Sequence, residues 1–237
     1  GQYSINATLT IMDQMRLNKY LAHFHGISRR EADLYIQQNR VLVNGKIASL
    51  GNIVKVGIDN VTLDNSEVTK TVKRYSYLLL NKPTGYVCSR KKQGDSPTIY
   101  ELLPKEFHHL KVAGRLDKDS QGLVLLTDDG DAIFKLTHPK FGKIKQYNVS
   151  INKPLTSTHF LDINNGIELE DGISKLSIKE IELNIKPNSY QVMMQEGRNR
   201  QIRRTFKQLG YTVTFLERTT LGPYRLSDLK NRRFLLI

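Results

Sequence analysis

The sequence changes character near residue 70, and this change limits the possible folds more than any other feature. Before it, two short helical patterns precede an Asn-Gly turn signal. After it, strand-like apolar runs dominate, with two helical segments between them. Runs of strands with few helices are typical of an α+β domain on a mostly antiparallel sheet. The sequence therefore predicts a small helical module followed by an α+β domain.

The first part of the chain has the signals of a helix–helix–hairpin unit. Apolar residues at helical spacing between 15 and 25 predict one helix. Ser28 and Glu31 form a capping-box pattern at the start of a second helix. Asn44-Gly45 between two short apolar runs is a strong hairpin signal. Short strands at 53–56 and 61–63 complete a module that we interpret as an αα-hairpin with a small β part.

These patterns divide the chain into four parts. We expect a flexible lead-in or artificial remnant at 1–14, the small module at 15–63, a polar linker at 64–73 and the α+β domain at 74–237. In the α+β domain we expect strands at 75–80, 122–126, 146–151, 190–194 and 212–216, and helices around 131–137 and 200–209.

The charge of the chain indicates a polyanionic partner. Lys and Arg number 36 against 23 Asp and Glu, a net charge of +13. Such a surplus favours nucleic acid, because each neutralised phosphate releases counterions; a soluble protein that is merely basic is the alternative. The single cysteine, Cys88, allows no internal disulfide and fits the cytoplasm. No apolar run approaches the roughly 18 residues of a membrane span, so we expect no membrane association.

One segment, residues 114–130, concentrates acidic groups in a polar loop before a buried strand. The spacing of Asp117, Asp119 and Gln121 mimics the start of a calcium-binding loop. A strand follows where that motif requires a helical context, so calcium is disfavoured, and turn-forming aspartates remain the alternative. His108, His109 and His138 lack metal-ligand spacing with Cys88 or with one another, and we expect no metal.

A second segment, residues 196–210, concentrates arginines. It follows a strand and opens a helix that carries four arginines and a lysine. Guanidinium groups bind phosphates bidentately and also keep a neighbouring carboxylate ionised. A solvated basic helix face is the alternative for this segment alone.

Together these segments resemble a known family. Gly114-Arg115-Leu116-Asp117 with Ser120, Gly122-Leu123 and Thr127 resembles the signature of the ribosomal-RNA pseudouridine synthases of the RsuA/RluB type. Asn-Lys-Pro-x-Gly at 81–85, Lys-Gln-Tyr at 145–147 and the arginine-rich stretch at 196–204 resemble three further motifs of that family. The module at 15–63 is similar to an S4-type RNA-binding domain. The match runs in order over about 15–230, and it implies a pseudouridine synthase domain at 74–237.

The resemblance assigns roles to individual residues. It implies that Asp117 is the catalytic aspartate, that Tyr147 stacks on the target uracil, and that Arg203 pairs with Asp117. It places Leu216 beneath the base. The further residues expected to contact substrate are Arg115, Lys82, Arg198 and Arg200, and those of the S4-type module expected to contact RNA are Arg16, Lys19, Arg29 and Arg30.

The resemblance also implies the reaction and its partners. A specific uridine of ribosomal RNA is isomerised to pseudouridine after its base has left the stack, without cofactor or metal. We expect a monomer that acts on a stem-loop or a pre-ribosomal particle, and residues 196–201 favour large-subunit RNA. The alternative is a non-catalytic RNA-binding factor in ribosome assembly. The intact Asp117, Tyr147 and Arg203 argue against that alternative.

Overall fold

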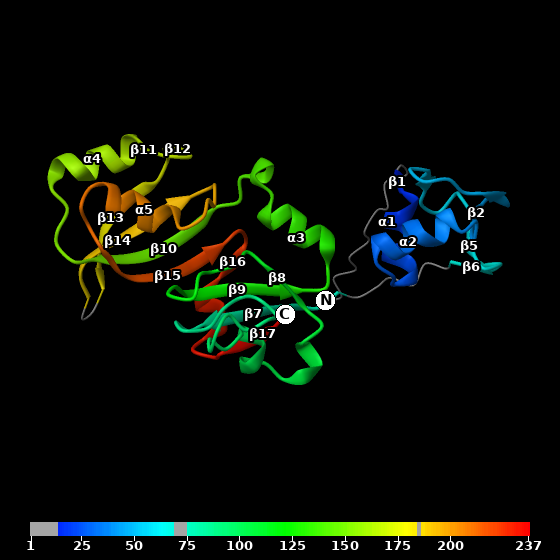
Figure 1. Cartoon of the computed structure of the whole chain (residues 1–237), viewed down its shortest axis with the longest axis horizontal. Helices are drawn as coiled ribbons and strands as arrows, with labels where there is room; N and C mark the ends of the chain where they lie inside the picture. Colours follow the sequence, from blue (N-terminus) through cyan, green and yellow to red (C-terminus); the bar gives the residue numbers. More distant parts are fainter. Residues whose placement is uncertain (1–13, 69–74, 184–185) are drawn as a thin grey trace, which may run out of the picture. The chain divides into compact units, whose positions relative to one another are not determined.

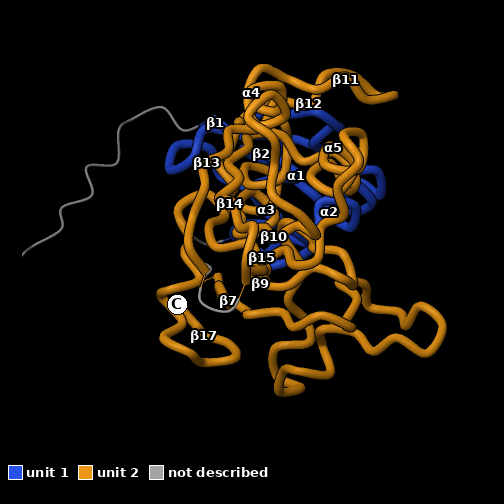
Figure 2. The backbone as a smooth tube through the Cα atoms, turned by 90° about the vertical axis from the view of Figure 1, so that its left-hand side faces the viewer, with its two compact units in different colours: residues 1–74 blue, residues 75–237 orange. Residues whose placement is uncertain are grey.

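The computed structural model describes residues 14–68, 75–183 and 186–237. The chain forms two compact units, residues 1–74 and residues 75–237 (Figures 1 and 2). The lead-in expected at 1–14 lies outside the described residues except for Gln14. Of the expected linker, residues 69–73 also lie outside them.

The first unit contains two helices and two small sheets. Its elements are β1 (Gln14–Arg16), α1 (Leu17–His25), α2 (Arg29–Gln37), β2 (Val41–Val43), β3 (Lys46–Ile47), β4 (Ile53–Lys55), β5 (Val61–Leu63) and β6 (Ser66–Glu67). Strand β1 pairs with β4, and the other sheet has the order β3-β2-β5-β6. The unit has its own apolar core, in which Leu21 and Ile36 of the two helices meet Val41 and Val54 of the strands.

Two local sequence patterns in this unit are found as the structures that they predicted. Ser28 caps α2 by accepting a hydrogen bond from the Glu31 amide at 3.1 Å. Asn44 and Gly45 both have positive φ, as the tight turn between β2 and β3 requires. Residues 64–68, expected in the linker, instead form a second hairpin, and Val68 is buried in the core.

The second unit is an α+β domain with a mixed, mostly antiparallel sheet. Its strands are β7 (Tyr77–Lys82), β8 (Lys111–Ala113), β9 (Gln121–Thr127), β10 (Lys145–Ile151), β11 (Ile167–Leu169), β12 (Gly172–Ser174), β13 (Ser177–Leu183), β14 (Lys186–Met194), β15 (Val213–Leu221), β16 (Tyr224–Arg225) and β17 (Phe234–Leu236). Its helices are α3 (Gly130–Thr137), α4 (Ser157–Asn165) and α5 (Gln201–Gln208), with short 3₁₀ turns η1 (Ile99–Leu102), η2 (Lys105–Phe107), η3 (Pro139–Phe141) and η4 (Leu226–Leu229). Helix α4 was not expected from the sequence.

The large sheet has the order β13-β14-β10-β15-β9-β7-β17 (Figure 1). Every pairing along this order is antiparallel except that of β15 with β9, which is parallel and joins the two halves. Gly122 makes this close approach possible: its φ is +107°, and a Cβ there would lie 2.6 Å from the backbone nitrogen of Arg218. The expectation of a mostly antiparallel sheet is confirmed.

Two apolar cores cover the two faces of the large sheet. On one face, Ile163 of α4 and Phe206 of α5 pack in a cluster with Leu80, Val124 and Tyr147 of the strands. On the other face, Leu136 of α3 and Leu229 of η4 pack with neighbouring strand residues. No helix in the described ranges has both the length and the apolar character needed to cross a membrane.

Candidate active site

Asp117 lies on the loop that joins β8 to β9. Gly114 opens the loop with a φ of +76°, a conformation that glycine adopts without strain. Leu116 turns inward and is buried, whereas the side chain of Asp117 is 41% exposed. The Ser120 amide donates to the Asp117 carbonyl at 3.1 Å and closes a turn. The loop therefore fixes its backbone while presenting one carboxylate to solvent.

Lys82 holds this loop from beneath. Its Nζ donates hydrogen bonds to the carbonyl oxygens of Ser120, Pro83 and Lys118 at 2.6, 3.0 and 3.3 Å. The side chain is 0% exposed, and burial lowers the pKa of its ammonium group to about 8. From the sequence, Lys82 was expected to contact substrate. In this structure its ammonium group is buried against three carbonyl oxygens and supports the loop, and a contact with substrate stays a prediction.

Arg218 holds the start of the same loop. It projects from β15 and is 2% exposed. Its Nε donates to the Leu123 carbonyl at 2.8 Å, and its Nη2 donates to the Gly114 carbonyl at 2.5 Å. Arg218 was not among the site residues expected from the sequence. It could have been noticed as an arginine two positions after Leu216, in a strand whose other buried residues are apolar.

Two arginines of the α5 region face the loop. Arg200, which precedes α5 with a φ of +46°, brings Nη1 within 3.3 Å of Oδ2 of Asp117. The same guanidinium makes two bonds to the carboxylate of Asp119, at 2.9 and 2.8 Å. Arg203 donates to the Asp119 carbonyl at 2.9 Å and to Oγ of Ser120 at 3.1 Å. In this structure the hydrogen bond to the Asp117 carboxylate comes from Arg200, and the expected pairing of Arg203 with Asp117 stays a prediction.

The charges in this group are balanced. Two carboxylates, Asp117 and Asp119, face the two guanidinium groups of Arg200 and Arg203. The hydrogen bonds from Arg200 lower the pKa of Asp119. They also raise the pKa of Arg200, whereas burial lowers that of Arg203. The arrangement favours an ionised Asp119 beside the two guanidinium groups.

A group of buried apolar side chains lies beside the loop of Asp117. Tyr147 of β10 lies opposite Arg218 of β15, and Leu216 lies opposite Val149 in the same pair of strands. Tyr147 and Leu216 are 7% and 6% exposed and share one core cluster with Leu116 of the loop. The structure thus brings the expected base platform, the expected apolar residue and the loop of Asp117 into one region of the sheet.

Arg198 does not join this group. Its guanidinium bonds to Asp171 at 2.9 Å and to the carbonyl oxygens of Gly172 and Ile173 at 3.2 and 2.9 Å. Arg204 makes two further bonds to Asp171, each at 2.9 Å. Both arginines therefore attach the β11–β12 hairpin to the α5 region, and the expected substrate contact of Arg198 stays a prediction.

The remaining candidates lie on exposed surfaces. Arg115 is exposed beside Leu116, and its carbonyl accepts a bond from Arg218 at 3.5 Å. In the first unit, Arg16, Arg29 and Arg30 are exposed at the starts of α1 and α2, and Lys19 is half-buried in α1. Among the described residues, no group of three His, Cys, Asp or Glu side chains is arranged to hold a metal ion.

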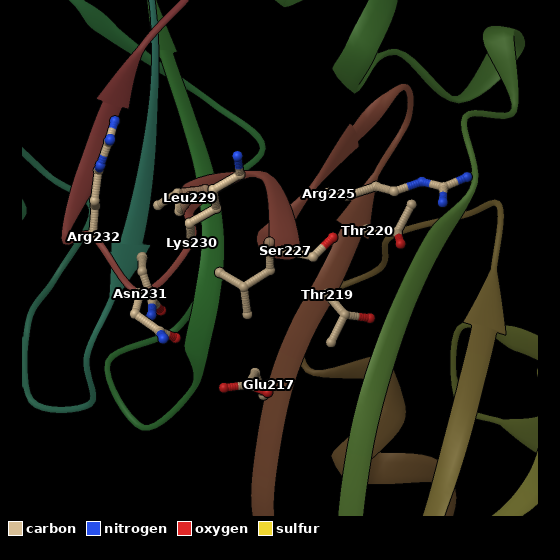
Figure 3. A pocket seen from close by; sticks show the side chains of 11 residues that line it. Glu217, Thr219, Thr220, Arg225, Ser227, Leu229, Lys230, Asn231 and Arg232 are labelled. Atoms are coloured by element: carbon tan, nitrogen blue, oxygen red, sulfur yellow. The ribbon is translucent and has the colours of Figure 1, made fainter.

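A pocket of about 620 Å³ lies on the other face of the sheet (Figure 3). Glu217, Thr219 and Thr220 of β15 line it, together with Asn81 and residues 225–227 and 229–232. Along a strand, successive side chains point to opposite faces, so Glu217 faces away from Leu216 and Arg218. The pocket contains none of the candidate residues.

Comparisons with known proteins give a consistent result. The sequence pattern of RNA pseudouridylate synthases matches residues 76–208, and that of the S4 domain matches residues 15–57. The chain is 34% identical to ribosomal large subunit pseudouridine synthase B of Pseudomonas aeruginosa, over 90% of this chain and 56% of that protein. It is 36% identical to ribosomal small subunit pseudouridine synthase A of Pasteurella multocida, over 90% and 91% of the two chains. A crystal structure of a pseudouridylate synthase aligns with a TM-score of 0.63 and 31% identity, covering 94% of this chain and 96% of that one.

Proposed function

Because the chain belongs to the RsuA/RluB/RluF family of RNA pseudouridine synthases with an N-terminal S4 domain, we propose that it isomerises one specific uridine of ribosomal RNA with Asp117 as catalytic carboxylate. In the net reaction the bond from N1 of uracil to C1′ of the ribose breaks and a bond from C5 to C1′ forms. The proton of C5 is lost and N1 gains one, so no external oxidant, reductant or nucleotide is consumed.

The observation that carries this proposal is the setting of Asp117. Its carboxylate is 41% exposed, lies 3.3 Å from the guanidinium of Arg200, and sits on a loop held by buried Lys82 and Arg218. An accessible carboxylate on a loop that is held in place is suited to attack an electrophilic carbon or to take a proton from the ribose. Both routes begin from the same carboxylate in the same geometry.

The neighbouring groups supply the rest of the site. A uridine in a helix must leave its stack before Asp117 reaches its sugar. In this proposal Tyr147 and Leu216 receive the extruded uracil, since aromatic and apolar side chains are the usual platforms for a flipped base. Arg200 donates a hydrogen bond to Asp117, and Arg203 acts on Asp117 through Asp119 and Ser120 by fixing the loop.

We propose large-subunit RNA as the substrate, presented as a stem-loop or in a pre-ribosomal particle. The stretch Glu-Gly-Arg-Asn-Arg-Gln at 196–201 supports this choice. The names of the relatives include both ribosomal subunits, so the choice rests on that stretch. The exposed arginines of the S4-type unit add phosphate contacts, and the protein acts as a monomer in the cytoplasm.

The decisive experiment maps pseudouridines in ribosomal RNA from a strain that lacks this gene and from the same strain complemented with it. We expect one uridine of large-subunit RNA to lose its modification on deletion and to regain it on complementation. A lost site in small-subunit RNA would correct the substrate. An unchanged map, together with no activity of the purified protein on either ribosomal RNA, would contradict the proposed function.

A further inference from the structure

An exposed aromatic cluster lies on α3 and on the segment that links α3 to β10. Phe134 and Phe141 are 46% and 37% exposed, and Ile144 is 41% exposed. The rings of Phe134 and Phe141 meet edge to face with centroids 5.5 Å apart. Solvent-exposed large apolar groups that lie together mark interaction surfaces more often than isolated ones do.

The cluster is held in place before any partner arrives. His138 packs against Phe134 with ring centroids 5.0 Å apart, and its Nδ1 accepts a bond from the Lys140 amide at 3.2 Å. At the far end of the segment, the Ile144 carbonyl accepts a bond from the Gly222 amide at 2.8 Å. A surface whose side chains are already ordered loses less conformational entropy on binding.

The charge of the segment that carries the cluster favours an anionic partner. From residue 132 to residue 161 the sequence contains no Asp or Glu and five lysines. The ammonium group of Lys140 lies 5.1 and 5.0 Å from the ring centres of Phe134 and Phe141, and Lys135 and Lys143 are exposed nearby. Aromatic faces combined with cations are the features by which proteins bind single-stranded nucleic acid: bases stack on the rings and phosphates meet the ammonium groups.

We propose that Phe134 and Phe141, with Lys140, form a stacking site for unpaired nucleotides of the RNA that flank the target uridine. This proposal deepens the proposed function and rests on it for the identity of the RNA. The segment leads directly into β10, which begins at Lys145 and carries Tyr147, so the stacking site and the expected base platform belong to one continuous stretch of chain. Because every base has a π-face, the site tolerates different flanking sequences.

Tryptophan fluorescence tests the site directly, because the chain contains no tryptophan. Phe141→Trp places one reporter in the cluster, and Leu161→Trp places a control on α4 at a position that is 60% exposed. Titration with an unstructured oligouridylate should quench the emission of Phe141→Trp saturably and leave that of Leu161→Trp unchanged. A duplex RNA of equal length should quench Phe141→Trp less, because its bases are already stacked.

Substitutions separate stacking from a general apolar contact. The double variants Phe134→Ala/Phe141→Ala and Phe134→Leu/Phe141→Leu should both bind oligouridylate more weakly, by about 5- to 150-fold for each base that stacks. Phe134→Tyr/Phe141→Tyr keeps both rings and should retain wild-type affinity. Thermal unfolding of each variant checks that these exposed changes leave the fold intact.

Two results would overturn the stacking site. The first is that the emission of Phe141→Trp stays unchanged under conditions in which the anisotropy of a labelled oligouridylate shows that the complex forms. The other is wild-type affinity of the leucine variant, which would indicate an apolar surface for a protein partner. Neither measurement requires turnover, so a failure of the proposed function, seen as absence of pseudouridine formation by the wild type, is distinguishable from a failure of this site.

Discussion

Arg200 joins Asp117 to Asp119: its Nη1 lies 3.3 Å from Oδ2 of Asp117 and 2.9 Å from Oδ1 of Asp119. The bidentate contact to Asp119 sets the plane of the guanidinium, because a planar fork matches a carboxylate in only one orientation. One of the two nitrogens that bind Asp119, Nη1, also bonds to Asp117. Asp119 therefore orients the cation that neighbours the proposed catalytic carboxylate, while most of the lone pairs of Asp117 remain available.

Asp117→Asn should abolish pseudouridine formation and leave RNA affinity within a few fold of the wild type. The amide is nearly isosteric and keeps an oxygen that accepts from Arg200, but it is neither a nucleophile nor a base at neutral pH. The assay is tritium release from RNA labelled at C5 of uridine, with a filter-binding measurement of affinity as control. Retention of a tenth of wild-type activity would contradict the assignment.

Variants of Tyr147 should separate stacking from the hydroxyl group. Tyr147→Phe keeps the ring and should bind RNA like the wild type, whereas Tyr147→Ala should bind about 5- to 150-fold more weakly, the expected loss of one stacked base. Affinity is measured with an RNA that contains the target uridine. If the two variants bind equally poorly, the ring of Tyr147 does not serve as a platform for the base.

Lys82 should make stability rise with pH in the alkaline range. Burial lowers its pKa from 10.5 to about 8, so between these values the unfolded chain binds a proton that the folded chain does not. We compare the free energies of unfolding of the wild type and of Lys82→Met at each pH. From pH 8 to pH 10.5 this difference should change in favour of the wild type by up to about 3 kcal/mol. Urea denaturation of both proteins across this range tests the sign. A difference that does not vary with pH would show that Lys82 is not desolvated in the fold.

Gly122→Ala should destabilise the second unit by at least about 2 kcal/mol, because an alanine there has a positive φ and its Cβ meets the backbone of Arg218. The matched control is Gly130→Ala at the start of α3. A Cβ at Gly130 has nothing within 4 Å, and alanine favours helix, so this variant should be as stable as the wild type or more so. Chemical denaturation gives both values. Equal stability of the two variants would argue against the close β9–β15 approach.

Removal of residues 1–74 should weaken RNA binding and reduce its dependence on salt. Each unit has its own apolar core, so a fragment of residues 75–237 should fold. The slope of log affinity against log salt should fall by about 0.7–0.9 for each phosphate that the fragment no longer neutralises. Residual turnover should be seen at high enzyme concentration and low salt. An unchanged slope in a folded fragment would show that the S4-type unit does not bind the RNA backbone.

Local signals in the sequence determined much of this protein. The capping residue Ser28 and the Asn44-Gly45 turn act over a few residues and are read directly. The change from helical patterns to strand-like apolar runs near residue 70 indicated the fold class. The spacing of apolar residues reflects which face of each helix or strand is buried. The motif around Asp117 gave the family, and with it the roles proposed for Asp117, Tyr147 and Leu216.

The tertiary structure decided which groups meet. Arg200 contacts Asp117 across 83 positions of sequence, and Arg218 reaches the Leu123 carbonyl across 95. These interactions depend on the parallel β15–β9 register and on the left-handed backbone of Arg200, neither of which has a local signal. From the sequence, Lys82 was expected to contact substrate; strand β7 places it beneath the loop of Asp117, where it is buried and bonds to the Ser120 carbonyl. Register and burial are properties of the packed sheet, so spacing along the chain does not specify them.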